Sequence, residues 1–344
     1  MIDTVHQSEP VMLPGRPFGR TVRSIAGYSL LTALMIVTPL LVFVPAALFH
    51  CAIRNGRRAA WATLVIAVAL ASLYVSTMSP TPVDAVKMAW TYLAGVALGI
   101  ALPSMASLPL VERGEKFGRV LVFLLTGSAL GLSLTEVASR QILNFSPYAA
   151  QLVQAQQTTT ELVQKYRAAG MPAEALQLFQ RLAGYSMQVL PAIMLMNVTL
   201  VFVLSLLMFG RLKTWRELTA RRGDSEALGA YLFRNLAFPD WLLFAFLFGG
   251  LTPVAHGLLQ KAAANVLTLV VFLYILQGLA IFRFLLVAMG AGFAGTALGW
   301  LLLGFLTITG VGPLLLGVAG LFDPFFDFRH FKKRKDDSHE GHSD

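Results

Sequence analysis

Seven polar or ionisable residues lie at the ends of long apolar runs, on the side opposite the Lys and Arg clusters. Such groups are costly at membrane depth, so they often mark a functional site. Brought together, they can form one outward-facing pocket, in which Lys87, Arg140 and Lys261 suit an anionic ligand. The candidate ligand-binding residues are Asp84, Lys87, Glu136, Arg140, His256, Lys261 and Asn265.

An alternative interpretation treats each of these residues as an interfacial group at a helix end, solvated on its own. Glu136 and Arg140 stand four positions apart, a spacing that pairs opposite charges along one helix face. Asp84 and Lys87 are three apart and can also interact locally. The sequence leaves both the single pocket and the scattered arrangement open.

Catalytic and metal-binding motifs such as G-x-S-x-G, H-E-x-x-H and C-x-x-C do not occur in the sequence. The single cysteine, Cys51, excludes an internal disulfide and a cysteine metal cluster. Asp323 and Asp327 are spaced like an acidic metal pair, but helix capping and pairing with Arg329 explain them with fewer assumptions, because hard cations need more oxygen ligands. We therefore expect no enzyme activity, no cofactor and no bound metal.

The composition is that of a membrane protein. Hydrophobic residues make up 56% of the chain and charged residues 13%, and the mean hydropathy is +0.67. Soluble domains carry about 25% charged residues. The net charge of +9 sits in short loops, so it is better explained by an anionic lipid leaflet than by nucleic acid. The lipid bilayer is the partner that the composition predicts.

Several apolar runs are long enough to cross about 30 Å of hydrocarbon, which takes about 20 residues. The six predicted spans are residues 59–78, 86–108, 119–138, 187–209, 240–258 and 264–286. Residues 24–53 and 290–323 are longer than one span requires. Pro39 interrupts the first of these runs, and the Gly310–Pro313 segment interrupts the second.

The basic clusters decide how these two long runs are oriented, since cytoplasmic loops retain Lys and Arg. If residues 24–53 enter the membrane and return, bending at Pro39, all basic loops share one side. The same argument makes 290–323 a helix pair. We predict an all-α polytopic bundle of six full spans with a short-helix hairpin near each end, about eight to ten membrane segments in all. Both termini are then cytoplasmic. We expect the protein to span the inner membrane of a bacterium several times.

The predicted organisation is a cytoplasmic tail (1–23), one transmembrane domain (24–329) and a disordered cytoplasmic tail (330–344). The polar insertion 139–186 is predicted to form two amphipathic helices outside the membrane. They form either a lid over a central cavity or a hairpin lying on the membrane surface. The basic loop 210–238 is cytoplasmic, and its part 211–234 is either an anchor on anionic lipid or a docking surface for a cytoplasmic protein.

Pairs of glycines four residues apart allow helices to approach closely in lipid. They occur at Gly95–Gly99, Gly127–Gly131 and Gly295–Gly299. We expect most of them to serve internal packing, with one available as a face for a partner.

Three short motifs in the C-terminal half carry a family resemblance. They are Phe233-Arg234-Asn235 with Phe238-Pro239-Asp240-Trp241, then Gln277-Gly278-Leu279-Ala280, and finally Gly320-Leu321-Phe322-Asp323 with Phe326-Asp327-Phe328-Arg329. Together they resemble the YybS-like family of bacterial membrane proteins. That family is similar to the substrate-binding S components of energy-coupling-factor vitamin transporters. The insertion 139–186 departs from a compact S component.

Two functions follow from these observations. The first is a small-molecule binding or transport component, which the outer polar residues and the resemblance to S components favour. The second is a non-catalytic membrane scaffold that recruits a cytoplasmic or envelope protein, which the basic loop 211–234 and the small-residue faces favour.

Overall fold

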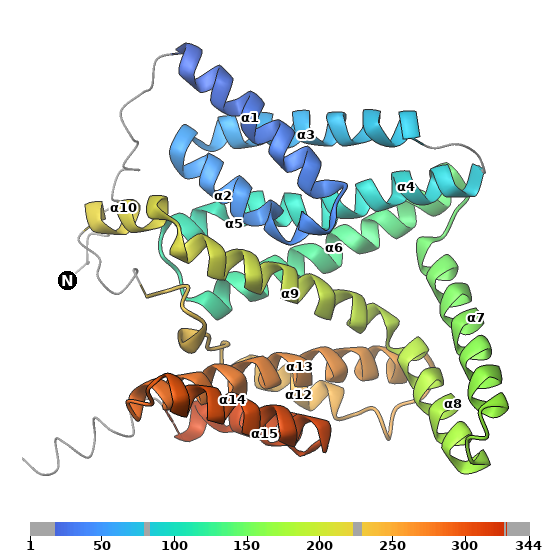
Figure 1. The fold of residues 1–344 in the computed structure, drawn as a ribbon. Coiled ribbons are helices and arrows are strands. Elements are labelled where there is room, and N and C mark those ends of the chain that lie inside the picture. The colour runs from blue at the N-terminus through green and yellow to red at the C-terminus, as the bar shows by residue number, and fades with distance from the viewer. Residues whose placement is uncertain (1–17, 79–82, 223–228, 327, 329–344) are drawn as a thin grey trace, which may run out of the picture.

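The described part of the chain consists of helices and the turns that join them. The computed structural model describes residues 18–78, 83–222, 229–326 and 328, and no β-strand occurs among them. Five helical segments in these ranges are long and apolar enough to cross a membrane (Figure 1). They are α3 (Arg57–Met78), the continuous α4 (Val83–Val96), η2 (Ala97–Ala101) and α5 (Leu102–Glu112), α6 (Phe117–Leu143), α9 (Leu190–Arg211) and α13 (Gly257–Ala288). The predicted all-helical polytopic membrane fold is confirmed.

The first apolar run folds back on itself, as predicted. After α1 (Phe18–Ile36), the Thr38 hydroxyl accepts a hydrogen bond from the backbone N–H two residues on, at 3.3 Å. Pro39 starts a short 3₁₀ helix, η1 (Pro39–Phe43), which leads directly into α2 (Val44–Asn55). Proline is favoured in a first helical turn because its missing N–H would have no partner there. The run therefore forms two short helices in place of one long span.

The last apolar run is also a helix pair. Helices α14 (Phe293–Ile308) and α15 (Val311–Phe326) change direction by 108° at the break between them. Gly310 at this break has a φ of +78°, a left-handed conformation that suits a residue without a Cβ. Helix α15 packs along α13, whereas α14 lies outside this pair and has no buried residue. The predicted pair is confirmed.

The predicted span at 240–258 is wrong. Helix α12 covers only Leu242–Gly249, about 12 Å in length, which is too short for a hydrocarbon core of about 30 Å. Residues 250–254 form turns. A side chain at Gly249 would collide with the backbone of Leu267 on α13, so α12 is held tightly against that helix. Pro253, within these turns, has no N–H with which to continue the helix.

Glycines set several of the closest helix contacts. A methyl group at Gly131 on α6 would collide with the carbonyl group of Leu98 in η2. One turn earlier, Gly127 lies against Pro103 on α5. On the C-terminal side, Gly299 of α14 lies against a leucine side chain of α13. The expected role of these small residues in internal packing is confirmed at these positions.

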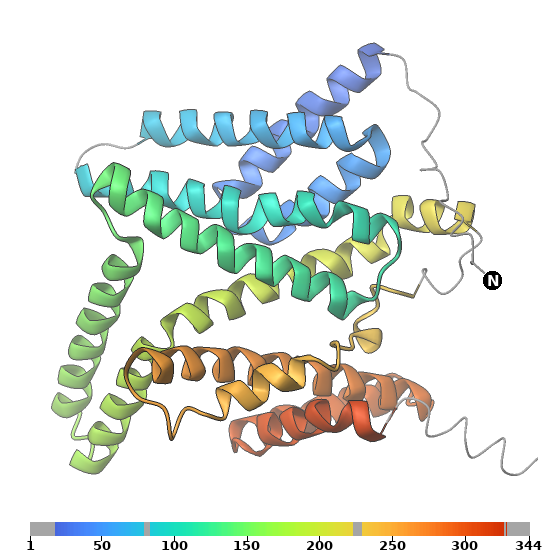
Figure 2. The ribbon, with the colours of Figure 1, turned by 180° about the vertical axis from the view of Figure 1, so that it is seen from behind.

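The helix connections gather at two opposite ends of the bundle (Figures 1 and 2). One end, which we call the basic end, holds the α2–α3 and α5–α6 connections and α10 (Lys213–Arg222). The other end holds α7 (Pro147–Ala168) and α8 (Ala173–Gln188), which together we call the arm. The segments that the charge pattern assigned to one side thus share one end. That the basic end faces the cytoplasm stays a prediction.

Candidate functional site

Glu136 fastens the first end of the arm to α6. Its carboxylate accepts hydrogen bonds from the Ser146 hydroxyl at 2.6 Å, the Tyr148 backbone N–H at 3.1 Å and Arg140 Nε at 2.5 Å. The Ser146 hydroxyl in turn accepts from the Ala149 N–H at 3.0 Å and caps α7. A carboxylate at a helix N-terminus satisfies backbone donors that have no partner within the helix.

The predicted Glu136–Arg140 pair is therefore present, but it is more than a local pair on one helix. The Glu136 side chain is 21% exposed and the Arg140 side chain 58% exposed, so the carboxylate is the better-protected partner. The sequence signal for its further contacts was the Ser146-Pro147 start of α7. That pair is typical of an N-cap and first helical turn, so it indicates where the helix begins but not that Glu136 lies beside it.

Asn265 fastens the other end of the arm. Its side-chain oxygen accepts from the Ala192 N–H at 3.0 Å, and its Nδ2 donates to the carbonyl oxygens of Gln188 at 3.1 Å and Lys261 at 2.8 Å. These bonds join the α8–α9 junction to α13. The Tyr185 hydroxyl adds a contact to Thr268 on α13 at 3.1 Å. Asn265 was predicted as a ligand-binding residue, and here its amide is engaged in joining three helices.

The remaining predicted site residues lie near these two fastenings. Lys87 is half-buried on α4, where its carbonyl accepts from the Thr91 hydroxyl at 2.8 Å. The side chain of Asp84 lies outside the described residues. His256 precedes α13, and both His256 and Lys261 are exposed. Lys87, Glu136 and Arg140 lie on α4 and α6, whereas His256, Lys261 and Asn265 lie at the start of α13, and the convergence of the two groups on one ligand stays a prediction.

The arm itself is a helical hairpin with its own small core. Val163 on α7 and Leu176 on α8 are buried, and the rings of Tyr166 and Phe179 meet edge to face with centroids 5.7 Å apart. The arm packs on the spans near its two ends, through α6, α9 and α13. The predicted pair of helices in the insertion is thus observed.

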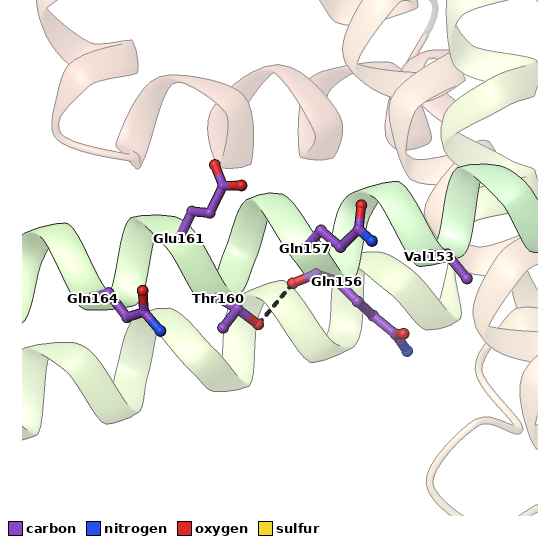
Figure 3. A pocket seen from close by; sticks show the side chains of 6 residues that line it. All are labelled: Val153, Gln156, Gln157, Thr160, Glu161 and Gln164. Carbon is purple, nitrogen blue, oxygen red and sulfur yellow. Dashed lines mark hydrogen bonds between the residues drawn. The ribbon is translucent and has the colours of Figure 1, made fainter.

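A polar strip runs along the exposed face of α7. Figure 3 shows its side chains along one helix, with Gln157 and Glu161 on one edge and Gln156 on the other. They line a shallow depression of about 350 Å³, formed by Val153, Gln156, Gln157, Thr160, Glu161 and Gln164. Within the described residues, no hydrogen bond engages the side-chain amides of the three glutamines. None of these six residues belongs to the predicted ligand-binding set, and the only signal for them in the sequence is the richness of this helix in Gln and Thr.

A second polar group is buried between α13 and α15. The Gln277 side chain accepts from the Phe238 backbone N–H at 3.1 Å and donates to Asp323 Oδ2 at 2.9 Å. Gln277 is 2% exposed and Asp323 8%. Next to them, a methyl group on Gly278 or Gly320 would collide with the backbone of the facing helix. The structure thus brings together the three motifs that carry the family resemblance.

This arrangement adds a partner for Asp323 that the sequence did not reveal. The predicted pairing with Arg329, and the role of Asp327, lie outside the described residues. Among the described residues, no group of three or more His, Cys, Asp or Glu side chains is placed to hold a metal ion.

The basic loop 210–238 is anchored by aromatic residues. Trp215 on α10 and Tyr231 are buried, with ring centroids 4.9 Å apart, and both pack near Phe209 at the end of α9. Burial, and to a lesser extent the charge of Glu115, raises the pKa of the Tyr231 phenol. The Thr214 hydroxyl also contacts His50 Nδ1 on α2 at 2.9 Å. The described part of the loop is therefore a packed element of the basic end.

Comparison with known families covers nearly the whole helical domain. A family described as "Predicted membrane protein (DUF2232)" matches residues 26–324. The chain belongs to this family. The matched region begins in α1 and ends in α15, so the DUF2232 region includes the N-terminal hairpin, the five long spans and the C-terminal pair. No curated protein and no solved structure matches the chain.

Membership in the DUF2232 family agrees with the multi-pass membrane fold. It also places the buried Gln277–Asp323 contact and the arm inside the matched region. The DUF2232 description names neither a ligand nor a reaction.

Proposed function

We propose that this chain is a non-enzymatic component of a bacterial cytoplasmic membrane that binds a small polar molecule at its arm end. The observation that carries the proposal is the polar strip of α7, held across one end of the bundle by fastenings at Glu136 and Asn265. Exposed amides aligned on one rigid helix offer both donors and acceptors to a ligand.

The chemistry of the strip favours a ligand with several hydroxyl or amide groups. Gln156, Gln157 and Gln164 supply paired donors and acceptors, and Glu161 supplies acceptors only. Lys261, exposed near the start of α13, suits an anionic group on the same molecule. In this proposal Glu136 and Asn265 hold the arm in place, and α7 makes the contacts that recognise the ligand.

The resemblance to S components supports a role in uptake. The N-terminal hairpin and the helical bundle are both compatible with a substrate-binding membrane subunit. In that role the chain binds its ligand at the outer side and passes it on together with a separate energy-supplying protein.

Extraction in mild detergent followed by native mass spectrometry tests the proposal. We expect a small molecule to stay with the wild-type chain and to be lost from the double variant Gln157→Leu/Glu161→Leu. The matched control is Gln180→Leu on α8, an exposed glutamine outside the strip, which should retain the molecule. Absence of any retained molecule from the wild-type chain, or equal retention by all three proteins, would contradict the proposal.

A scaffold function is the second candidate, and the rigid basic end favours it. Helix α10 is fixed by buried Trp215 and exposes Lys213 and Arg216 on its other face. A fixed basic face suits an acidic protein surface. The same extraction distinguishes the two functions, because a scaffold would bring a stoichiometric protein partner. That partner should be lost from Lys213→Glu/Arg216→Glu and kept by the α7 double variant.

A further inference from the structure

Helix α8 has a wider apolar face than the protein covers. Leu176 is buried and Phe179 half-buried against α7. Beside them, Leu178, Leu182 and Tyr185 are 59%, 57% and 47% exposed. Positions three and four apart lie on one side of a helix, so these three residues form a single stripe. Among the polar residues of α8, Gln180 lies on the opposite side and Gln177 lies about 100° around the helix from Leu178, whereas Arg181 flanks the stripe.

The position of α8 relative to the spans shows what this stripe meets. Only Val189 separates α8 from α9, one of the five spans. The Tyr185–Thr268 contact fixes the end of α8 beside α13. With 32 residues, α13 is about 48 Å long and exceeds the hydrocarbon core by about 18 Å. Gln260, Lys261 and Asn265 make the first turns of α13 polar, so we assign the excess length to this end. Thr268, eleven positions after Gly257 and about 17 Å along the helix, then falls close to the membrane boundary.

The direction of α8 agrees with this depth. In both ribbon views the arm runs across the ends of the long helices and not alongside them (Figures 1 and 2). A helix in this position lies roughly in the plane of the membrane surface. Amphipathic helices of this kind bury their apolar side at the boundary between headgroups and acyl chains. Tyrosine is enriched at the same level because its ring is apolar and its hydroxyl polar.

We propose that the stripe Leu178–Leu182–Tyr185 inserts into the lipid leaflet at the arm end and makes α8 an interfacial helix. The occupant of the stripe is the bilayer surface. Helix α7 is then held on the other side of α8 by the Tyr166–Phe179 contact. The lipid contact adds a third support to the arm, besides Glu136 and Asn265, and it does not depend on whether α7 binds a ligand.

Site-directed fluorescence in lipid nanodiscs tests this inference. Single cysteines are introduced at Leu178 and Leu182, with matched controls at the exposed Gln177 and Gln180, in a Cys51→Ala background. Each is labelled with an environment-sensitive dye. Lipids that carry a quencher near the headgroup should quench the dye at Leu178 and Leu182 several-fold more strongly than at the controls. The emission at these two positions should also shift to shorter wavelength.

Equal and weak quenching at all four positions would overturn the inference, because the arm would then stand in water. Weak quenching accompanied by chain-to-chain cross-linking through Leu178→Cys would also overturn it, since a second copy would cover the stripe. Hydrogen exchange of α8 provides an independent measurement on unlabelled protein. We expect slower exchange in nanodiscs than in a short-chain detergent, and Leu178→Ser/Leu182→Ser should remove that difference.

Discussion

The Gln277 amide donates a hydrogen bond to Asp323 across 2.9 Å, and this contact joins two helices whose residues lie 46 positions apart in the chain. The same amide accepts from the Phe238 N–H, so one side chain connects α13, α15 and the segment before α12. Buried polar groups are costly unless they are hydrogen-bonded. This contact is therefore a support of the C-terminal part of the fold.

Replacing Gln277 with leucine should destabilise the protein. The substitution removes the hydrogen bond from Gln277 to Asp323 and leaves the buried Phe238 N–H without its acceptor, which costs about 1–3 kcal/mol. We expect a clearly lower apparent melting temperature in detergent. Thr126→Val serves as the control, because that exposed hydroxyl bonds only within its own helix. Similar melting temperatures for both variants would contradict a supporting role for Gln277.

The contact between α13 and α15 should not tolerate a side chain at Gly278. An added methyl group would collide with the carbonyl of Leu316, so Gly278→Ala must push the two helices apart. Gly304 on α14 is the matched control, since no atom lies within 4 Å of an added Cβ. Gly304→Ala should be neutral, or stabilising by about 0.5–1 kcal/mol through lower chain entropy. Thermal unfolding of both variants measures the difference.

Glu136 should contribute more than Arg140 to the stability of the attachment between the arm and α6. Glu136→Ala removes the acceptor of three hydrogen bonds and should cost about 1–3 kcal/mol, with faster hydrogen exchange at the start of α7. Arg140→Ala removes the more exposed partner and should cost about 1 kcal/mol or less. Equal effects of the two substitutions on the exchange of the Tyr148 amide would show that the carboxylate does not fasten α7.

The Tyr231 phenol should make stability depend on pH in the alkaline range. Its pKa in the folded protein is raised by burial, while in the unfolded chain it is about 10. The unfolded chain therefore releases this proton first, so the contribution is present below about pH 10 and is lost as the pH rises above it. Tyr231→Phe should reduce that alkaline loss. At neutral pH it should cost little, because the hydroxyl has no hydrogen-bond partner among the described residues. Tyr231→Ala should cost about 3–5 kcal/mol through the cavity.

The orientation of the bundle can be measured by cysteine labelling in intact cells, in a Cys51→Ala background. An impermeant reagent should label Gln164→Cys on the arm. Lys116→Cys and Arg54→Cys, at the basic end, should react only after the cells are permeabilised. Labelling of Arg54→Cys from outside would contradict the hairpin orientation of residues 24–55.

The sequence determined the helical membrane fold and most of its segments. Apolar length is a property of the chain itself, so the spans through α3, α6, α9 and α13 could be predicted from it. Proline and glycine interrupt helices locally, so their effect can also be predicted from the sequence. The bends at Pro39 and Gly310 were predicted for that reason.

The prediction of a span at 240–258 from length and hydropathy was wrong, because a short helix packed on α13 has the same apolar composition as a membrane span. The decisive feature is the collision that a side chain at Gly249 would cause with the Leu267 backbone. That feature depends on which helix lies opposite, so composition does not contain it.

Tertiary structure also decided what the polar residues do. Glu136 and Arg140 were visible as a pair because their spacing is local. The carboxylate contacts to Ser146 and Tyr148, the bonds of Asn265 to the α8–α9 junction, and the Gln277–Asp323 contact all join separate elements. Whether a polar side chain at a helix end meets a ligand, water or a neighbouring backbone depends on how the helices pack. A single sequence fixes the periodicity of each helix, but the packing between helices assigns its polar groups their partners.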